Sequence, residues 1–229
     1  MQNNSFINSI LFTEKPFIGS FVNEIKNNDL TLWRMYGKEA LEEAKGCAIT
    51  IDIEKLKENI IEGLNISKDL DIPIDFEEIE FYNVAYLERN KFKFSGAEES
   101  ELEILNKVMN ELEFEILDLN KELNENSEEK LKIIELVNEI AYLFKSAEYK
   151  YENEVRLVIK KAVGFKKIIN ETFLPPKVYI ELASITSSIK EITIGPKVER
   201  AEEWASAFHY SLNDKGYNAK ISISTLPFK

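Results

Sequence analysis

One short stretch, YKYENEVRLVI at residues 149–159, carries charged side chains in a pattern that could do chemistry. Glu152, Glu154 and Arg156 alternate there with other residues, and alternation with a period of two is typical of a β-strand. Side chains two apart in a strand share a face, about 7 Å from one another. An arginine beside a carboxylate keeps it ionised, and an ionised carboxylate can stabilise an oxocarbenium-like centre. Glu154 is therefore the first candidate catalytic residue and Glu152 the second, with Arg156 as a ligand-binding residue.

The same pattern has an alternative interpretation that involves no site. Opposite charges on the solvated face of a sheet form a ladder worth about 0.2–1 kcal/mol per pair. The two interpretations differ in what surrounds Glu154. A cleft lined by aromatic and charged groups would favour an enzyme, whereas a flat, solvated face would favour the ladder.

A second group of candidate residues lies in LWRMYG, residues 32–37, which we expect to form a short helix capped by Asp29 and ended by Gly37. An arginine between two aromatic residues can present its guanidinium beside aromatic walls, although tryptophan is usually buried in a core. Ligand binding is assigned here to Trp33, Arg34 and Tyr36. If they share a site with Glu154, Arg34 must lie within about 15 Å of it, given the size of a small domain.

The composition excludes several kinds of site. Cys47 is the only cysteine and His209 the only histidine, so neither an intrachain disulfide nor a thiolate or histidine-rich metal site is expected. Glycine-rich phosphate loops, nucleophile elbows and zinc-ligand spacings are absent from the sequence. We therefore expect no metal and no cofactor. Cys47 begins an apolar segment, which predicts an inert buried thiol.

The net charge of −12 argues against a nucleic-acid backbone or an anionic membrane as partner. Apolar runs in the sequence stay far below the ~20 residues of a membrane span. The N-terminus also lacks the basic region that precedes the apolar run of a signal peptide. The cytoplasm is the expected location.

The middle of the chain repeats apolar residues at steps of three and four, which is typical of a helical a/d seam. The repeat comprises Leu102, Leu105, Met109, Leu112, Ile116, Leu119 and Leu123, then Ile133, Leu136, Ile140, Leu143 and Ala147. The short break between them predicts an antiparallel αα-hairpin. Residues 98–154 hold 17 acidic and 6 basic side chains, which is −11 of the total −12. Such faces are usually just solvated, but they can also bind a protein partner or pair two copies into a homodimer.

Strands are expected at 5–12, 17–22, 46–53, 78–88, 152–161, 177–183, 190–196 and 220–225, and further helices at 55–64 and 200–215. The uncharged start of the 46–53 strand predicts burial on both faces. Strands, a helical insertion and strands again predict the α+β class. We expect one domain over residues 1–229: a mixed, mostly antiparallel sheet with flanking helices and a long αα-hairpin inserted at about 98–147.

Four motifs occur in a fixed order: LWRMYG, GCAITI at 46–51, YENEVRLVI at 151–159 and ITIGPK at 192–197. This order resembles the bacterial family catalogued as domain of unknown function 2971, in its Trp-Arg-x-Tyr-Gly variant, from about Ser20 to the end. The resemblance implies a fold and candidate positions, not an activity. Family members begin with a tyrosine-rich strand and an Asn-Asp-Pro stretch that this sequence lacks. We therefore expect an N-terminally shortened member of the family, which lacks any site residues that this segment supplies.

Glu-x-Glu at the start of a strand also resembles the last catalytic motif of ADP-ribosyltransferases, in which a glutamate holds a ribose hydroxyl while the nicotinamide bond ionises. This resemblance implies a nucleotide ligand, with Glu154 as the leading carboxylate. Two functions stay open. One is a binding or regulatory module that uses its acidic hairpin, and the other is a nucleotide- or glycosyl-transfer enzyme that uses a Glu-Arg pair in a cleft.

Overall fold

The computed structural model describes residues 16–66, 79–122, 128–160, 165–182 and 184–228. Helices combine with small, mostly antiparallel sheets, so the predicted α+β class is confirmed. The chain divides into two compact units, the first made of Met1–Phe21 and Glu77–Ala162 and the second of Val22–Phe76 and Val163–Lys229. The single domain over 1–229 stays a prediction, and each unit is described separately. In the described ranges, no helix has the length and hydropathy needed to cross a bilayer.

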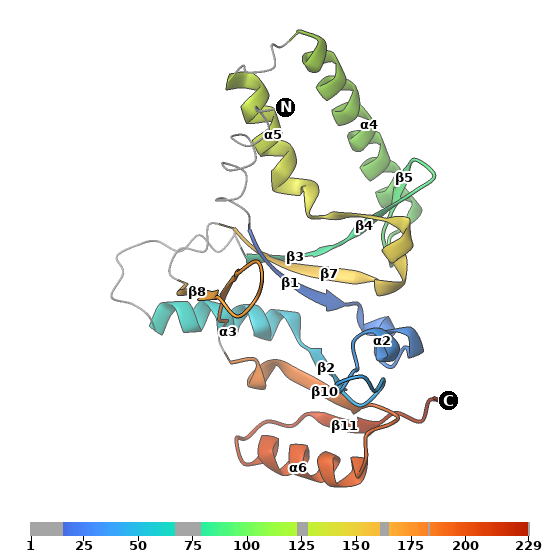
Figure 1. Ribbon diagram of the computed structural model, residues 1–229, viewed down its shortest axis with the longest axis vertical. Helices are drawn as coiled ribbons and strands as arrows, with labels where there is room; N and C mark the ends of the chain where they lie inside the picture. The colour runs from blue at the N-terminus through green and yellow to red at the C-terminus, as the bar shows by residue number, and fades with distance from the viewer. Residues whose placement is uncertain (1–15, 67–78, 123–127, 161–164, 183, 229) are drawn as a thin grey trace. The chain divides into compact units, whose positions relative to one another are not determined.

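The first unit contains two three-stranded sheets (Figure 1). One has the order β1 (Phe17–Val22), β7 (Glu154–Ile159), β3 (Ile79–Asn83), with β3 antiparallel to β7. The other has the order β5 (Lys91–Lys93), β4 (Ala85–Glu88), β6 (Phe144–Ser146), with β4 parallel to β6. The strand expected at 78–88 is thus two strands that part at the buried Val84.

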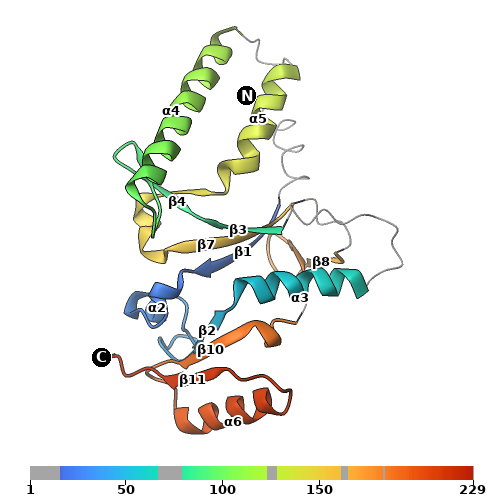
Figure 2. The ribbon, with the colours of Figure 1, turned by 180° about the vertical axis from the view of Figure 1, so that it is seen from behind.

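Helices α4 (Glu99–Glu122) and α5 (Glu128–Ala141) also belong to the first unit and run in opposite directions (Figures 1 and 2). We call these two helices the helical arm. The prediction that helix continues through Leu143 to Ala147 is wrong, because β6 and the 3₁₀ helix η3 (Ala147–Glu152) follow α5. Pairing of residues 144–146 with β4 outweighs the helical periodicity of this segment.

A single side chain fixes the base of α4 to the edge strand β5. The amide of Asn106 accepts from the backbone N–H of Phe92 at 2.7 Å and donates to the Phe92 carbonyl at 2.9 Å. It thereby satisfies both backbone groups of Phe92 much as a neighbouring strand would. The Phe92 ring also packs on that of Phe144, with centroids 4.8 Å apart.

The second unit is built around the sheet β11 (Lys220–Ile223), β10 (Ile189–Ile194), β2 (Cys47–Ile51), in which β10 is parallel to β11 and antiparallel to β2. Helix α6 (Ala201–Asn213) covers it through Leu212, which packs with Ile192 and Ala219. The remaining elements are η1 (Glu24–Lys26), α2 (Leu30–Met35), α3 (Ile53–Ile66), η4 (Thr186–Ser188) and a separate antiparallel pair, β8 (Lys167–Asn170) with β9 (Lys177–Ile180).

Some strand predictions need correction. Strand β8 was not expected, and the strand expected at 5–12 lies outside the described residues. Strand β2 is not buried on both faces, since Cys47 and Ile49 are exposed. The reason is that β2 is the edge of its sheet, whereas an uncharged run predicts a central strand. The prediction of a buried thiol at Cys47 is wrong for the same reason.

Close backbone packing explains the glycines of three motifs. The N–H of Gly46 donates to the carbonyl of Gly37 at 3.3 Å, and the N–H of Gly195 donates to the carbonyl of Gly46 at 2.9 Å. A Cβ on Gly195 would lie 2.5 Å from the Ala44 carbonyl oxygen, and one on Gly37 would lie 2.7 Å from the Trp33 ring. These backbone contacts therefore hold the three motifs against one another within the second unit.

Candidate functional site

The candidate carboxylates lie at the start of β7, and the chain path there differs from the expected strand. Ser146 caps η3, which includes Glu152, and Asn153 ends it in a left-handed conformation with φ of 47°. Asparagine tolerates this conformation better than most residues. The strand therefore begins at Glu154 rather than at Glu152. Both glutamate side chains are buried even though only one belongs to the strand.

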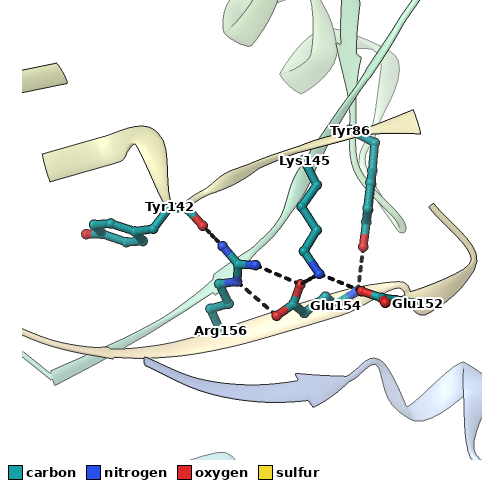
Figure 3. Close-up of polar contacts among 6 residues, drawn as sticks. All are labelled: Tyr86, Tyr142, Lys145, Glu152, Glu154 and Arg156. Carbon is teal, nitrogen blue, oxygen red and sulfur yellow. Dashed lines mark hydrogen bonds and ion pairs between the residues drawn. The ribbon is translucent and has the colours of Figure 1, made fainter. Parts of the chain in front are cut away.

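The carboxylate of Glu154 is bound on both oxygens (Figure 3). Arg156 donates from Nε to Oε1 at 2.9 Å and from Nη2 to Oε2 at 3.1 Å, which is the strong bidentate geometry. The ammonium of Lys145 lies 2.7 Å from Oε2. The Glu154 side chain is only 4% exposed, so the solvated ladder of charges is not what forms here.

Lys145 joins the two carboxylates, because its Nζ also lies 2.6 Å from Oε2 of Glu152. Lys145 and Tyr86 are register partners in the parallel pair of β6 and β4, so their side chains share a face. Both reach the start of β7, where the N–H of Glu154 donates to the Tyr86 hydroxyl at 2.9 Å. We call Lys145, Glu152, Glu154 and Arg156 the ionic cluster, and its two cations balance its two carboxylates.

Electrostatics within the ionic cluster favour the charged forms. Burial by itself raises the pKa of Glu154, but hydrogen bonds from Arg156, Lys145 and Ser20 outweigh burial and hold that pKa below its ordinary value. Burial opposes the charge of Lys145 as well, yet its bonds to the two carboxylates raise the pKa of Lys145. Glu154 and Lys145 are therefore both charged at neutral pH.

Arg156 makes one further contact, which links the ionic cluster to the helical arm. Its Nη1 donates to the backbone carbonyl of Tyr142, the residue that follows α5 (Figure 3). The last carbonyls of a helix have no partner inside the helix, and a cation placed there both bonds them and complements the helix dipole. The guanidinium thus ties the end of α5 to β7 through Glu154.

This arrangement suits anchoring better than proton transfer. A general base needs a pKa near the working pH and a lone pair that faces the substrate. The Glu154 carboxylate has a lowered pKa, and donors occupy both of its oxygens. The same contacts connect β1 through Ser20, the end of α5, β6 and β7.

Trp33, Arg34 and Tyr36 lie in the second unit. The indole of Trp33 is buried and donates to Oδ1 of Asn28 at 2.9 Å, whereas Arg34 and Tyr36 are exposed. Nε of Arg34 lies 3.9 Å from the carboxylate of Glu43, and the Arg34 guanidinium lies 5.4 Å from the centre of the Phe228 ring. The expected meeting of Arg34 with Glu154 would join residues of different units and stays a prediction, as do the ligand-binding roles.

Sequence reasoning missed Lys145, Tyr86 and Ser20. Lys145 lay at the end of an expected helix, so its position on a strand beside β4 was not foreseen. Nothing in the local pattern reports the register of two short parallel strands far apart in the sequence. Across the part of the chain that the structure describes, acidic, cysteine and histidine side chains form no group of three or more that could hold a metal ion.

Comparison with known families and proteins gives a match to a family model. No curated protein and no solved structure is significantly similar to this chain. The family model described as "Protein of unknown function (DUF2971)" matches residues 32–157, from the Trp-Arg motif to the middle of β7. The match spans more than half of the 229 residues and includes the whole helical arm and the ionic cluster. The chain therefore belongs to the DUF2971 family.

Proposed function

We propose that this protein is a binding or regulatory module of the cytoplasm that contacts a protein partner through its helical arm. The observation that carries the proposal is the contact of Arg156 with the Tyr142 carbonyl, because it gives the YENEVRLVI motif a role in fixing the arm. Asn106 fixes the other helix at its base. An arm held at its base can present a defined surface without first paying the entropy of ordering it.

The surface of α4 supports this proposal. The helix carries eight acidic and two basic residues, a net charge of −6. Five large apolar side chains are nevertheless exposed on it: Ile104, Val108, Phe114, Leu117 and Leu119. Exposed apolar groups that carboxylates surround are typical of an interaction surface. The matching partner surface is apolar with a basic rim, because opposite charges at the rim guide association.

Site-specific photocrosslinking in expressing cells tests this function. A photoreactive residue in place of Val108, which is 53% exposed on α4, should give a covalent adduct with another polypeptide. The matched control replaces Leu41, an exposed apolar residue of the second unit, and should give none. Adducts of equal yield at both positions, or no adduct at Val108, would contradict the proposal.

A second candidate function is a nucleotide- or glycosyl-transfer enzyme of the ADP-ribosyltransferase type, with Glu154 as the leading carboxylate and Glu152 as the second. The buried cluster of opposite charges favours it, since such clusters gather at active sites. Arg156 and Lys145 would have to leave the Glu154 oxygens before these could reach a ribose. A shift of the melting temperature by a nicotinamide dinucleotide that Glu154→Ala abolishes would favour the enzyme, and an equal response of both proteins would count against it.

A further inference from the structure

The β8–β9 hairpin of the second unit leaves apolar side chains uncovered. Ile169 and Val178 lie opposite each other in the register of the two strands and are 63% and 53% exposed. Phe173 and Leu174, in the connection between the strands, are exposed as well. A lone two-stranded hairpin is marginally stable in water at best, so this one needs a surface to pack against.

The charges around this apolar patch indicate the sign of the charge on the surface that would cover it. Lys167 lies two residues before Ile169 on β8, so its side chain shares a face with those of Ile169 and Val178. Lys166, the residue before this strand, is exposed as well, and Lys177 is exposed on the other face of the hairpin. Residues 165–181 hold three lysines and two glutamates within an acidic chain. An apolar centre with a basic rim is complementary to an apolar centre with an acidic rim.

Helix α4 has such a face. Ile104 and Val108 are one turn apart, and Glu111 and Glu115 continue the same face at steps of three, four and seven. Both apolar side chains are more than half exposed, and both glutamates are exposed. Both surfaces therefore have exposed apolar side chains at the centre, and the charges beside them are opposite in sign.

We propose that the partner of the helical arm is a second copy of this chain, with α4 of one copy packed on the β8–β9 hairpin of the other. This inference rests on the proposed function of the arm. A two-fold axis makes the contact twice, since the arm of each copy meets the hairpin of its partner. Such a reciprocal dimer is closed and covers both apolar patches of both copies.

Charge reversal tests the dimer. In light scattering with size exclusion at up to about 100 μM, which saturates a low-micromolar contact, the full chain should have twice its monomer mass of 26.5 kDa. Reversal of the hairpin in Lys166→Glu/Lys167→Glu, or of the arm in Glu111→Lys/Glu115→Lys, should raise the dissociation constant about tenfold or more. The control Lys38→Glu/Lys215→Glu makes the same change of net charge as the hairpin reversal, at exposed positions elsewhere, and should stay dimeric. Circular dichroism checks that each variant is folded.

Mixing the two reversed variants gives the sharpest result. The acidic hairpin of one then faces the basic arm of the other, and the reverse holds at the second contact, so the mixture should form heterodimers. The chain with all four substitutions should also dimerise. A monomeric wild type, a dimer that neither reversal weakens, or a mixture that stays monomeric would overturn the inference.

The crosslinking at Val108 separates this inference from the proposed function. An adduct of twice the monomer mass supports both. An adduct with a different protein, together with a monomeric wild type, overturns the second-copy inference and leaves the binding function standing. No adduct at Val108 overturns both.

Discussion

The guanidinium of Arg156 donates to the backbone carbonyl of Tyr142 at the end of α5, while its other nitrogens hold the Glu154 carboxylate. A helix terminus, a strand and a buried carboxylate are thus joined by one side chain. The YENEVRLVI motif therefore helps to hold the helical arm in place. Through Arg156, the ionic cluster is connected directly to the end of α5.

Replacement of Arg156 by alanine should destabilise the protein strongly. The substitution removes one of the two cations that contact the buried Glu154 carboxylate. Breaking a buried ion pair by removing one partner costs about 3–5 kcal/mol. The matched control is Arg200→Ala, which removes an exposed Arg–Glu pair with Glu203 worth about 1 kcal/mol or less. Free energies of unfolding from urea titrations measure both. Equal losses in the two variants would contradict the anchoring role.

Replacement of Asn106 by alanine should cost about 1–3 kcal/mol, because both backbone groups of Phe92 lose their bonds to the side chain. Asn110→Ala makes the same change at an exposed position of α4 and should be neutral or slightly stabilising, since alanine favours helix. Thermal unfolding of the two variants measures the difference. An equal stability of both would show that the base of α4 does not depend on Asn106.

Replacement of Gly195 by alanine should disrupt the second unit. The new Cβ would lie 2.5 Å from the Ala44 carbonyl oxygen and 2.7 Å from that of Gly46, and backbone atoms give way only at a cost of about 1–3 kcal/mol or more. In Gly96→Ala the new Cβ meets no atom within 4 Å, so the only loss of stability comes from the positive φ and is about 1–2 kcal/mol. Yields of folded protein and urea midpoints should rank Gly195→Ala below Gly96→Ala, and the opposite order would contradict the packing described.

Acid should weaken the protein partly through Glu154. The pKa of this carboxyl is lower in the folded protein than its ordinary value of 4.5, so its contribution is present above pH 4.5 and is lost as the pH falls through the folded pKa. The stability of the wild type should therefore fall between about pH 5 and pH 3 more steeply than that of Glu154→Gln, which does not titrate there. Parallel slopes of unfolding free energy against pH would contradict the ionised state of Glu154.

Local sequence signals were enough for the α+β class and for most elements. Asp29 caps α2 as expected, and the apolar steps of α4 matched a helix from Glu99 to Glu122. The pairing of Glu154 with Arg156 also follows from a spacing of two within one strand. Each of these features depends on residues close together in the sequence.

Long-range pairing was beyond such reasoning. Residues 144–147 continue the helical period of α5, yet β4 recruits Phe144 to Ser146 as a strand and so brings Lys145 to the carboxylates. The left-handed turn at Asn153 likewise separates two glutamates that alternation alone would place on one strand. Tertiary packing and the buried charges stabilise this strand and this turn, and a local sequence pattern contains no information on either.

Amide hydrogen exchange along α5 tests most directly whether the ionic cluster holds the helical arm. Glu154→Gln keeps the shape of the side chain but removes its charge, so exchange over residues 128–141 should accelerate about tenfold or more while α6 keeps its protection. Glu139→Gln, an exposed substitution on α5 itself, is the control and should change little. Unchanged exchange of α5 in Glu154→Gln, or equal acceleration in both variants, would contradict the anchoring of the arm by Glu154 and Arg156.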